Sequence, residues 1–239
     1  MKNVNVMRAA VLMGHGDIDQ LQVREDMPIP RPGREEVLIR VGASAVNNTD
    51  INTRVGWYSQ SRSEADAAWS GNPMKFPRIQ GADCCGQITS VGSAIDPARI
   101  GERVLVRTMQ EPVNVDGDLI PITLGSEIEG AFAEYLSVRA SEAFVIDSPL
   151  DDAELASFPC SYSTAEGLLQ RARVGAERVL ITGASGGVGS AAVQLAAMRG
   201  ASVVAATTGV RADDLRRIGA GEIIDRAGDL VDQLGESSI

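Results

Sequence analysis

Short blocks of alternating apolar and polar residues fill the first 140 residues. Glycine- and proline-rich turns separate the blocks, and the turn at 27–33 has the sequence Met-Pro-Ile-Pro-Arg-Pro-Gly. Strands at intervals of about ten residues are typical of a β-rich, barrel-like domain. We expect its strands at residues 7–13, 21–26, 36–42, 79–92, 101–107 and 132–138.

The periodicity changes near residue 150. Helical spacing at 151–157 and 163–173 is followed by strand (178–183), helix (187–199), strand (202–207), helix (211–218) and strand (222–225). This order predicts a right-handed βαβαβ half of a doubly wound parallel sheet. We therefore expect two domains, 1–148 and 149–239. A complete fold of this type has six strands, so roughly 90 further residues would be needed. Either the chain is a truncated product, or a reduced fold stands on three strands.

A glycine-rich turn joins the first strand of the second domain to its helix. Val179, Leu180 and Ile181 form a buried strand, and small apolar residues follow from Gly187 to Met198. Glycines let a backbone approach a pyrophosphate, and a helix start offers unpaired N–H groups and partial positive charge. The alternative is a tight strand–helix turn without a ligand. We predict coenzyme contacts at Gly183, Ser185, Gly186, Gly187, Val188 and Gly189.

Charge and composition exclude several classes of partner. The net charge of −10 and the pI near 4.7 argue against nucleic acid or an anionic membrane. No apolar run approaches the roughly 20 residues of a membrane span, and the N-terminus does not resemble a signal peptide. Three cysteines, two of them adjacent, suit a reducing compartment. We expect a cytoplasmic protein with a small-molecule substrate.

Several stretches together resemble one family, in the same order along the chain. They are Met7-Arg-Ala-Ala-Val, Pro28-Ile-Pro-Arg-Pro-Gly, Glu36-Val-Leu-Ile-Arg-Val, Val46-Asn-Asn-Thr-Asp-Ile, Gly81-Ala-Asp-Cys-Cys-Gly, Gly101-Glu-Arg-Val, Ala131-Phe-Ala-Glu-Tyr and Gly183-Ala-Ser-Gly-Gly-Val-Gly. The chain resembles the quinone oxidoreductase branch of the medium-chain dehydrogenase/reductase superfamily, truncated at the C-terminus. The resemblance implies a GroES-like β-barrel domain followed by a partial Rossmann domain. Related enzymes are often dimers, so a homodimer is one assembly that it allows.

The chain departs from the zinc-dependent members of that superfamily. Where they carry a cysteine just before the Thr-Asp step this chain has Asn48, and their Gly-His-Glu corresponds here to Gly81-Ala82-Asp83. Three cysteines and His15, which lies in a glycine-flanked turn, do not supply a tetrahedral zinc site. We predict no metal.

The end of the second strand bears on the choice of coenzyme. NAD-binding folds place Asp or Glu about 20 residues past the glycines, whereas this chain has no carboxylate there until Asp213. Thr207, Thr208 and Arg211 would accept a 2′-phosphate, and Arg211 matches the basic position of the resembled family. We predict NADPH. Thr164 matches a family threonine near the nicotinamide; the alternative is a helix-surface hydroxyl.

The resemblance also implies hydride transfer to a quinone or an activated alkene, with charge developing on a carbonyl oxygen. Tyr58 falls where related enoyl-thioester reductases have a proton-donating tyrosine. Asn47 and Asp50 match positions that line the nicotinamide pocket. Alternatively, Tyr58 packs with Trp57 as a hydrophobic lid, and Asp50 caps a short helix.

Two functions from different classes follow. One is a zinc-independent, NADPH-dependent oxidoreductase acting on quinones, enones or similar carbonyl compounds. The other is a truncated, non-catalytic NADPH-binding or vestigial protein. The polar insertion at 59–75 is either a loop over the site or a solvated excursion.

Overall fold

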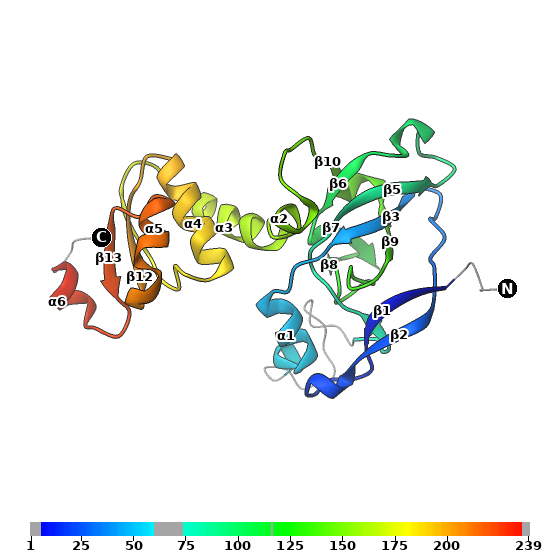
Figure 1. Cartoon of the computed structure of the whole chain (residues 1–239), viewed down its shortest axis with the longest axis horizontal. Helices are drawn as coiled ribbons and strands as arrows, with labels where there is room; N and C mark the ends of the chain where they lie inside the picture. The colour runs from blue at the N-terminus through cyan, green and yellow to red at the C-terminus, as the bar shows by residue number, and fades with distance from the viewer. Residues whose placement is uncertain (1–5, 60–73, 116, 236–239) are drawn as a thin grey trace. The chain divides into compact units, whose positions relative to one another are not determined.

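The computed structural model describes residues 6–59, 74–115 and 117–235 (Figure 1). Most of the predicted insertion at 59–75 therefore lies outside the described residues. The chain divides into two compact units, Met1–Cys160 and Ser161–Ile239, which are described separately below. The assignment of domains to 1–148 and 149–239 stays a proposal.

The first unit is built on a five-stranded antiparallel sheet with the strand order β10-β6-β5-β3-β9. A three-stranded sheet in the order β2-β1-β4 and the hairpin β7–β8 complete its strands. Buried aliphatic side chains from the large sheet, including Val37, Ile39, Ile88 and Leu136, form its main core. The strands are β1 (Val6–Leu12), β2 (Leu21–Pro28), β3 (Glu36–Ala43), β4 (Arg78–Ile79), β5 (Cys85–Val91), β6 (Arg103–Val106), β7 (Met109–Val115), β8 (Asp118–Thr123), β9 (Tyr135–Arg139) and β10 (Ala143–Val145).

The second unit is a three-stranded parallel sheet in the order β11-β12-β13, with strands Arg178–Ile181, Ser202–Thr207 and Glu222–Asp225. Helices α4 (Gly187–Met198) and α5 (Ala212–Arg217) alternate with these strands. Helix α3 (Pro159–Arg171) precedes the sheet and α6 (Leu230–Leu234) follows it. The predicted β-rich part followed by a parallel sheet is therefore confirmed.

Small side chains let α4 lie close to its neighbours. Ala191 and Ala192 are buried against Ala165 of α3, and Ala196 packs with Val203 and Ala205 of β12. An alanine stripe lets two backbones approach closely, and alanine has the highest helix propensity.

The sequence analysis did not predict the strands β7, β8 and β10 or the helices α1 and α6. The hairpin β7–β8 was missed because Pro112 and Pro121 interrupt its strands, and Pro112 lies where the register shifts between Gln110 and Val113. β10 was also missed. The stretch after Val46 contains helix α1 (Asn48–Arg54), which the sequence analysis considered only as the alternative in which Asp50 caps a short helix. Short 3₁₀ turns occur at Ile18–Gln20, Trp57–Ser59, Pro97–Arg99, Ala140–Glu142 and Gly209–Arg211, and the short helix α2 at Asp152–Ala156.

Candidate functional site

The start of α1 holds two of the predicted catalytic residues. Asn47 is the N-cap, and the Asp50 carboxylate, three residues on, accepts the backbone N–H of Asn47 at 2.8 Å. The other Asp50 oxygen accepts the N–H of Ala82 at 3.0 Å, and the Asp50 side chain is buried. Asp50 therefore closes the helix start as the partner of the cap rather than as the cap itself.

A second carboxylate lies beside this helix start. Asp83, fully buried, accepts the Asn47 side-chain amide at 2.7 Å, the backbone N–H of Cys160 at 2.7 Å and the Thr108 hydroxyl at 3.3 Å. Three donors around one carboxylate offset much of the cost of burying its charge. We call Asn47, Asp50 and Asp83 the carboxylate cluster.

Burial governs the protonation of this cluster. Removal from water raises the pKa of Asp50 to about 6, and the neighbouring Asp83 charge adds to the shift. Burial also raises the pKa of Asp83 above the usual range for aspartate. The pKa of the Cys160 thiol rises to about 12 because that side chain is desolvated and lies near both carboxylates. The thiol is therefore protonated at neutral pH and is a poor nucleophile.

Tyr58 is joined to α1 through its hydroxyl, which lies 3.0 Å from the Thr49 hydroxyl oxygen. Its ring meets Trp57 edge to face, with ring centroids 5.3 Å apart, and Trp57 is exposed. Tyr58 thus combines the packing of the lid alternative with a hydroxyl fixed by a hydrogen bond. The catalytic roles of Tyr58, Asn47 and Asp50 stay predictions.

Sequence reasoning missed three members of this neighbourhood, namely Asp83, Thr108 and Cys160. An aspartate directly before two cysteines, inside the predicted strand 79–92, was the available signal, because a charge in an apolar segment needs partners. Within the described ranges, no three His, Cys, Asp or Glu side chains lie close enough together to hold a metal ion. The lack of such a group does not test the prediction that the chain works without zinc.

In the second unit, β11 leads into the glycine-rich turn and α4 begins at Gly187, with Gly186 as N-cap. Gly183 has a φ of +60°, a conformation that residues with side chains rarely adopt. A Cβ at Gly189 would lie 2.2 Å from the Gly183 carbonyl oxygen. These two glycines are explained by the turn itself.

Gly186 and Gly187 differ from Gly183 and Gly189, because the backbone of the turn does not require a glycine at either position. Neither has a positive φ, and a Cβ at Gly187 would meet only the Cβ of Ser161, at an ordinary 3.5 Å. A Cβ at Gly186 would come no closer than 3.4 Å to the chain. Glycine in a helical turn costs up to about 1 kcal/mol relative to alanine. The fold of this unit therefore does not account for the pair, whereas a ligand lying against their backbone would.

The other predicted coenzyme residues surround the ends of these elements. Ser185 is exposed beside the glycines, and Val188 packs into the small apolar cluster of α3 and α4. Thr207 ends β12 with a buried side chain, and Thr208 begins the next turn. Arg211 is exposed and makes no ion pair with any residue that the structure describes. Thr164 is exposed on α3, about one turn beyond Ser161.

No helix in the described part of the chain is long and apolar enough to cross a membrane.

Most of the first unit matches a known domain family. Residues 33–148 match the model of the alcohol dehydrogenase GroES-like domain.

Curated relatives match nearly the whole chain. An NADPH-dependent alkenal/one oxidoreductase of Arabidopsis thaliana is 29% identical over 95% of this chain and 54% of its own length. A chloroplastic quinone-oxidoreductase of Triphysaria versicolor is 32% identical over 92% of this chain and 61% of its own length. The chain thus spans about half to three fifths of these relatives.

A solved structure agrees with them. A provisionally named alcohol dehydrogenase from Sinorhizobium meliloti 1021 superposes with a TM-score of 0.87 and 41% identity, over 95% of this chain and 64% of that one. The β-domain, the parallel sheet with its glycine turn and these matches lead to one conclusion. The first unit carries an alcohol dehydrogenase GroES-like domain, and the chain as a whole is similar to quinone and alkenal oxidoreductases and to alcohol dehydrogenases of the medium-chain dehydrogenase/reductase superfamily.

Proposed function

We propose that the chain acts as a zinc-independent, NADPH-dependent oxidoreductase that reduces a quinone, an enone or a similar small carbonyl compound. The observation that carries the proposal is the pair Gly186 and Gly187. Both are exposed at the start of α4, and neither is required by the fold of its own unit. Their bare backbone and the helix N-terminus fit a pyrophosphate.

The coenzyme would be held by residues of the second unit. The turn from Gly183 to Gly189 would carry the pyrophosphate, and Thr208 and Arg211 would take the 2′-phosphate of the adenosine ribose. No carboxylate lies between Thr207 and Arg211 to repel that phosphate. The buried Thr207 side chain is better suited to ending β12 than to binding an anion. When bound, the coenzyme would supply the hydride.

Residues of the first unit would manage the charge on the substrate. If the Thr49 hydroxyl donates to the Tyr58 oxygen, the Tyr58 proton is left for a substrate carbonyl oxygen. Hydrogen bonding of that kind stabilises the negative charge that develops during reduction. Asn47 and Asp50 would act by fixing the start of α1, because their polar atoms are bound within the carboxylate cluster.

The experiment is NADPH oxidation by the full chain against a panel of quinones and enones, with coenzyme binding measured in parallel. Turnover supports an oxidoreductase. Binding without turnover by any compound would favour the non-catalytic alternative, and the absence of binding would contradict both. Three free cysteines fit a reducing compartment, and we propose the cytoplasm, although relatives include chloroplastic proteins.

A matched pair of glycine variants tests the coenzyme site. Gly187→Ala should stabilise α4 slightly, yet weaken NADPH binding about tenfold or more, because its methyl group would occupy space needed by the pyrophosphate. Gly167→Ala, in α3, adds the same methyl group where the chain leaves open space. It should bring the same small stabilisation and leave NADPH binding unchanged.

A further inference from the structure

Asp83 is the residue at which the starts of two helices meet. Its Oδ2 atom accepts the side-chain amide of Asn47, the N-cap of α1, at 2.7 Å. Its Oδ1 atom accepts the backbone N–H of Cys160, in the first turn of α3, also at 2.7 Å. The two oxygens of one buried carboxylate are therefore divided between two helices.

The start of α3 is bonded to a residue from elsewhere in the chain. Pro159, at the first position of the helix, has no N–H group, and Phe158 before it has no side-chain oxygen that could serve as a cap. Asp83, 77 residues earlier than Cys160, accepts the next N–H along the helix. A carboxylate at a helix N-terminus is favoured by the partial positive charge there, so Asp83 stabilises the first turn of α3.

The segment that contains Asp83 also fixes the start of α1. The Ser44 hydroxyl donates to the carbonyl oxygen of Asp83 at 2.6 Å, and the buried Gln80 side chain donates to the carbonyl oxygen of Asp50 at 3.0 Å. Tyr58, through its contact with the Thr49 hydroxyl, is joined to a helix that is itself attached to Asp83.

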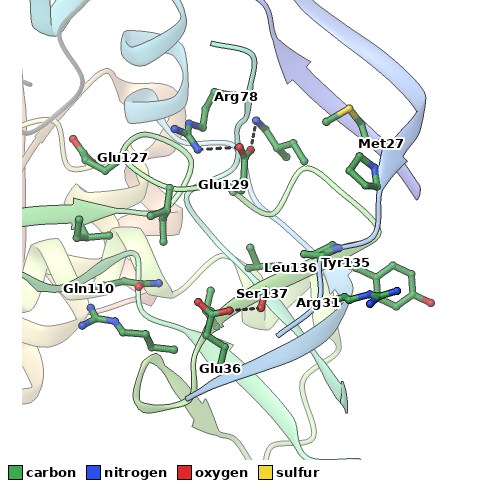
Figure 2. A pocket seen from close by; sticks show the side chains of 18 of the residues that line it. Met27, Arg31, Glu36, Arg78, Gln110, Glu127, Glu129, Tyr135, Leu136 and Ser137 are labelled. Atoms are coloured by element: carbon green, nitrogen blue, oxygen red, sulfur yellow. Dashed lines mark hydrogen bonds and ion pairs between the residues drawn. The ribbon is translucent and has the colours of Figure 1, made fainter. Parts of the chain in front are cut away.

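Asp83 is enclosed by the chain rather than open to a substrate, because its exposed fraction is 0%. Figure 2 shows the cavity of about 630 Å³ in the first unit. Among the described residues that line this cavity are Met27, Gln110 and Leu136, whereas no residue of the carboxylate cluster does. A carboxylate enclosed in this way acts on a reaction by holding other groups in place.

Helix α3 continues into the unit that is proposed to hold the coenzyme. Its first two residues end the first unit, and the rest belong to the second. Within the second unit, a Cβ at Gly187 would lie 3.5 Å from the Cβ of Ser161, and Ala165 packs with Ala191 of α4. The helix that is bonded to Asp83 is therefore also the helix that packs against the glycine turn.

We propose that Asp83 is a positioning residue for the proposed reduction, in which it keeps the start of α1 attached to the first turn of α3. The inference rests on the proposed function, because it assigns Asp83 a part in that reaction. A misplacement of about 1 Å in the reacting groups can cost about a hundredfold in rate. Loosening either helix start should therefore slow hydride transfer. The affinity for NADPH should not change, because the proposed coenzyme contacts lie within the second unit.

Asp83→Asn tests this role, because it keeps the shape of the side chain and leaves one accepting oxygen. Its NH₂ group must face either the Asn47 amide or the donors from Thr108 and Cys160, so one side loses its acceptor. We expect the kcat for NADPH oxidation with an enone to fall about tenfold or more, with the Kd for NADPH within about twofold of wild type. Both are measured at a temperature at which the variant is folded.

Glu142→Gln is the matched control for a loss of stability alone. Glu142 is a second fully buried carboxylate of the first unit; it is paired with Arg107 and Arg139 and accepts the backbone N–H of Glu111. None of these partners belongs to α1 or α3. This variant should lower the urea midpoint and leave kcat unchanged. If Asp83→Asn also left kcat unchanged, or weakened NADPH binding instead, the inference would be overturned while the proposed function stood.

Exchanging the two side chains should restore the pairing. When Asn47→Asp is combined with Asp83→Asn, the new amide donates to the new carboxylate, and the amide oxygen still accepts the N–H of Cys160. Aspartate is also a preferred N-cap, so α1 keeps its cap. The kcat should return to within about threefold of wild type. A double variant as slow as Asp83→Asn would show that this pairing does not position α1.

Hydrogen exchange tests the link between the two helix starts without any turnover. Asn47→Ala changes only the α1 side of Asp83, but a buried carboxylate with fewer donors is less firmly fixed. Exchange at the Cys160 amide should therefore speed up about threefold or more relative to the amide of the buried Ile39, whereas Asn48→Ala should leave this ratio unchanged. If wild type reduced no quinone or enone, the proposed function would fail, and this ratio would decide the link. An unchanged ratio in Asn47→Ala would overturn it.

Discussion

The side-chain amide of Asn47 donates to the carboxylate of Asp83 across 2.7 Å, joining the start of α1 to the segment between β4 and β5. Asp83 is fully buried, so its charge depends on this bond and on the donors from Cys160 and Thr108. The contact therefore couples the position of a predicted catalytic helix to the interior of the β-domain.

Asn47→Ala removes one of the donors to Asp83. We expect a loss of about 1–3 kcal/mol in the free energy of unfolding, because a buried carboxylate is left short of a partner. Urea unfolding at pH 7 measures the loss. Asn48→Ala is the matched control, since Asn48 is exposed one residue further on, and it should change stability by less than about 0.5 kcal/mol. If both variants lost the same free energy of unfolding, the proposed role of the Asn47 amide as a donor to Asp83 would be contradicted.

Asp50 should make stability depend on pH in an unusual direction. Its pKa is about 6 in the folded chain, against about 3.9 in an unfolded one, so the folded state binds the proton more tightly. Between about pH 4 and 6, the free energy of unfolding should fall as pH rises, by about 3 kcal/mol from this group, and then level off.

Asp50→Asn removes that contribution, although it also places an amide where two backbone N–H groups require an acceptor. The measured quantity is the wild-type stability minus that of the variant, from urea unfolding at a series of pH values. This difference should fall from pH 4 to 6 and stay level above. The exposed Asp118→Asn serves as a control, for which the difference should be flat. A difference for Asp50→Asn that rises with pH would contradict the account.

Tyr58→Phe separates the two interpretations of Tyr58, because phenylalanine keeps the contact with Trp57 and loses only the hydroxyl. If the hydroxyl donates to the substrate oxygen, the rate of enone reduction should fall about a hundredfold, with NADPH affinity unchanged. Thr49→Val should lower the rate less, by releasing the Tyr58 oxygen from its partner. If Tyr58→Phe left the rate of enone reduction unchanged, only the interpretation of Tyr58 as a residue that packs with Trp57 in a hydrophobic lid would remain.

Arg211→Ala tests the coenzyme preference. An exposed arginine without an ion pair among the described residues is free to bind a phosphate, so its loss should weaken NADPH binding about tenfold or more and leave NADH binding unchanged. Arg216→Ala is the control, because Arg216 is paired with Asp213 within α5. If Arg211→Ala weakened both coenzymes equally, its role in choosing NADPH would be lost.

The second unit could be predicted from sequence almost element by element, since apolar strands, glycines and small helical residues each dictate local structure. Strands 202–207 and 222–225 match β12 and β13, and α4 begins at the predicted Gly187. The elements of the first unit were harder to predict. Helix α1 has no apolar stripe, so only its capping chemistry between Asn47 and Asp50 marked it.

The interior of the candidate site could not be predicted in the same way. Asp83, Thr108 and Cys160 are far apart in the sequence, and their meeting depends on how strands of the large sheet are ordered. Gln110 lies on the hairpin β7–β8, whose prolines do not fit the pattern of a strand. The cavity of about 630 Å³ that Gln110 lines in the first unit could therefore not be predicted from the periodicity of the sequence. Patterns of two or four residues carry no information about such long-range contacts.

The most direct test of the central claim is hydrogen exchange at the glycine turn, measured while NADPH is titrated into the full chain. If the coenzyme lies against the start of α4, the amides from Ser185 to Gly189 should slow as the site fills, and Gly187→Ala should shift that change to higher NADPH concentration. If NADPH produces no protection at this turn, a coenzyme at α4 is contradicted, and the oxidoreductase assignment for this chain with it.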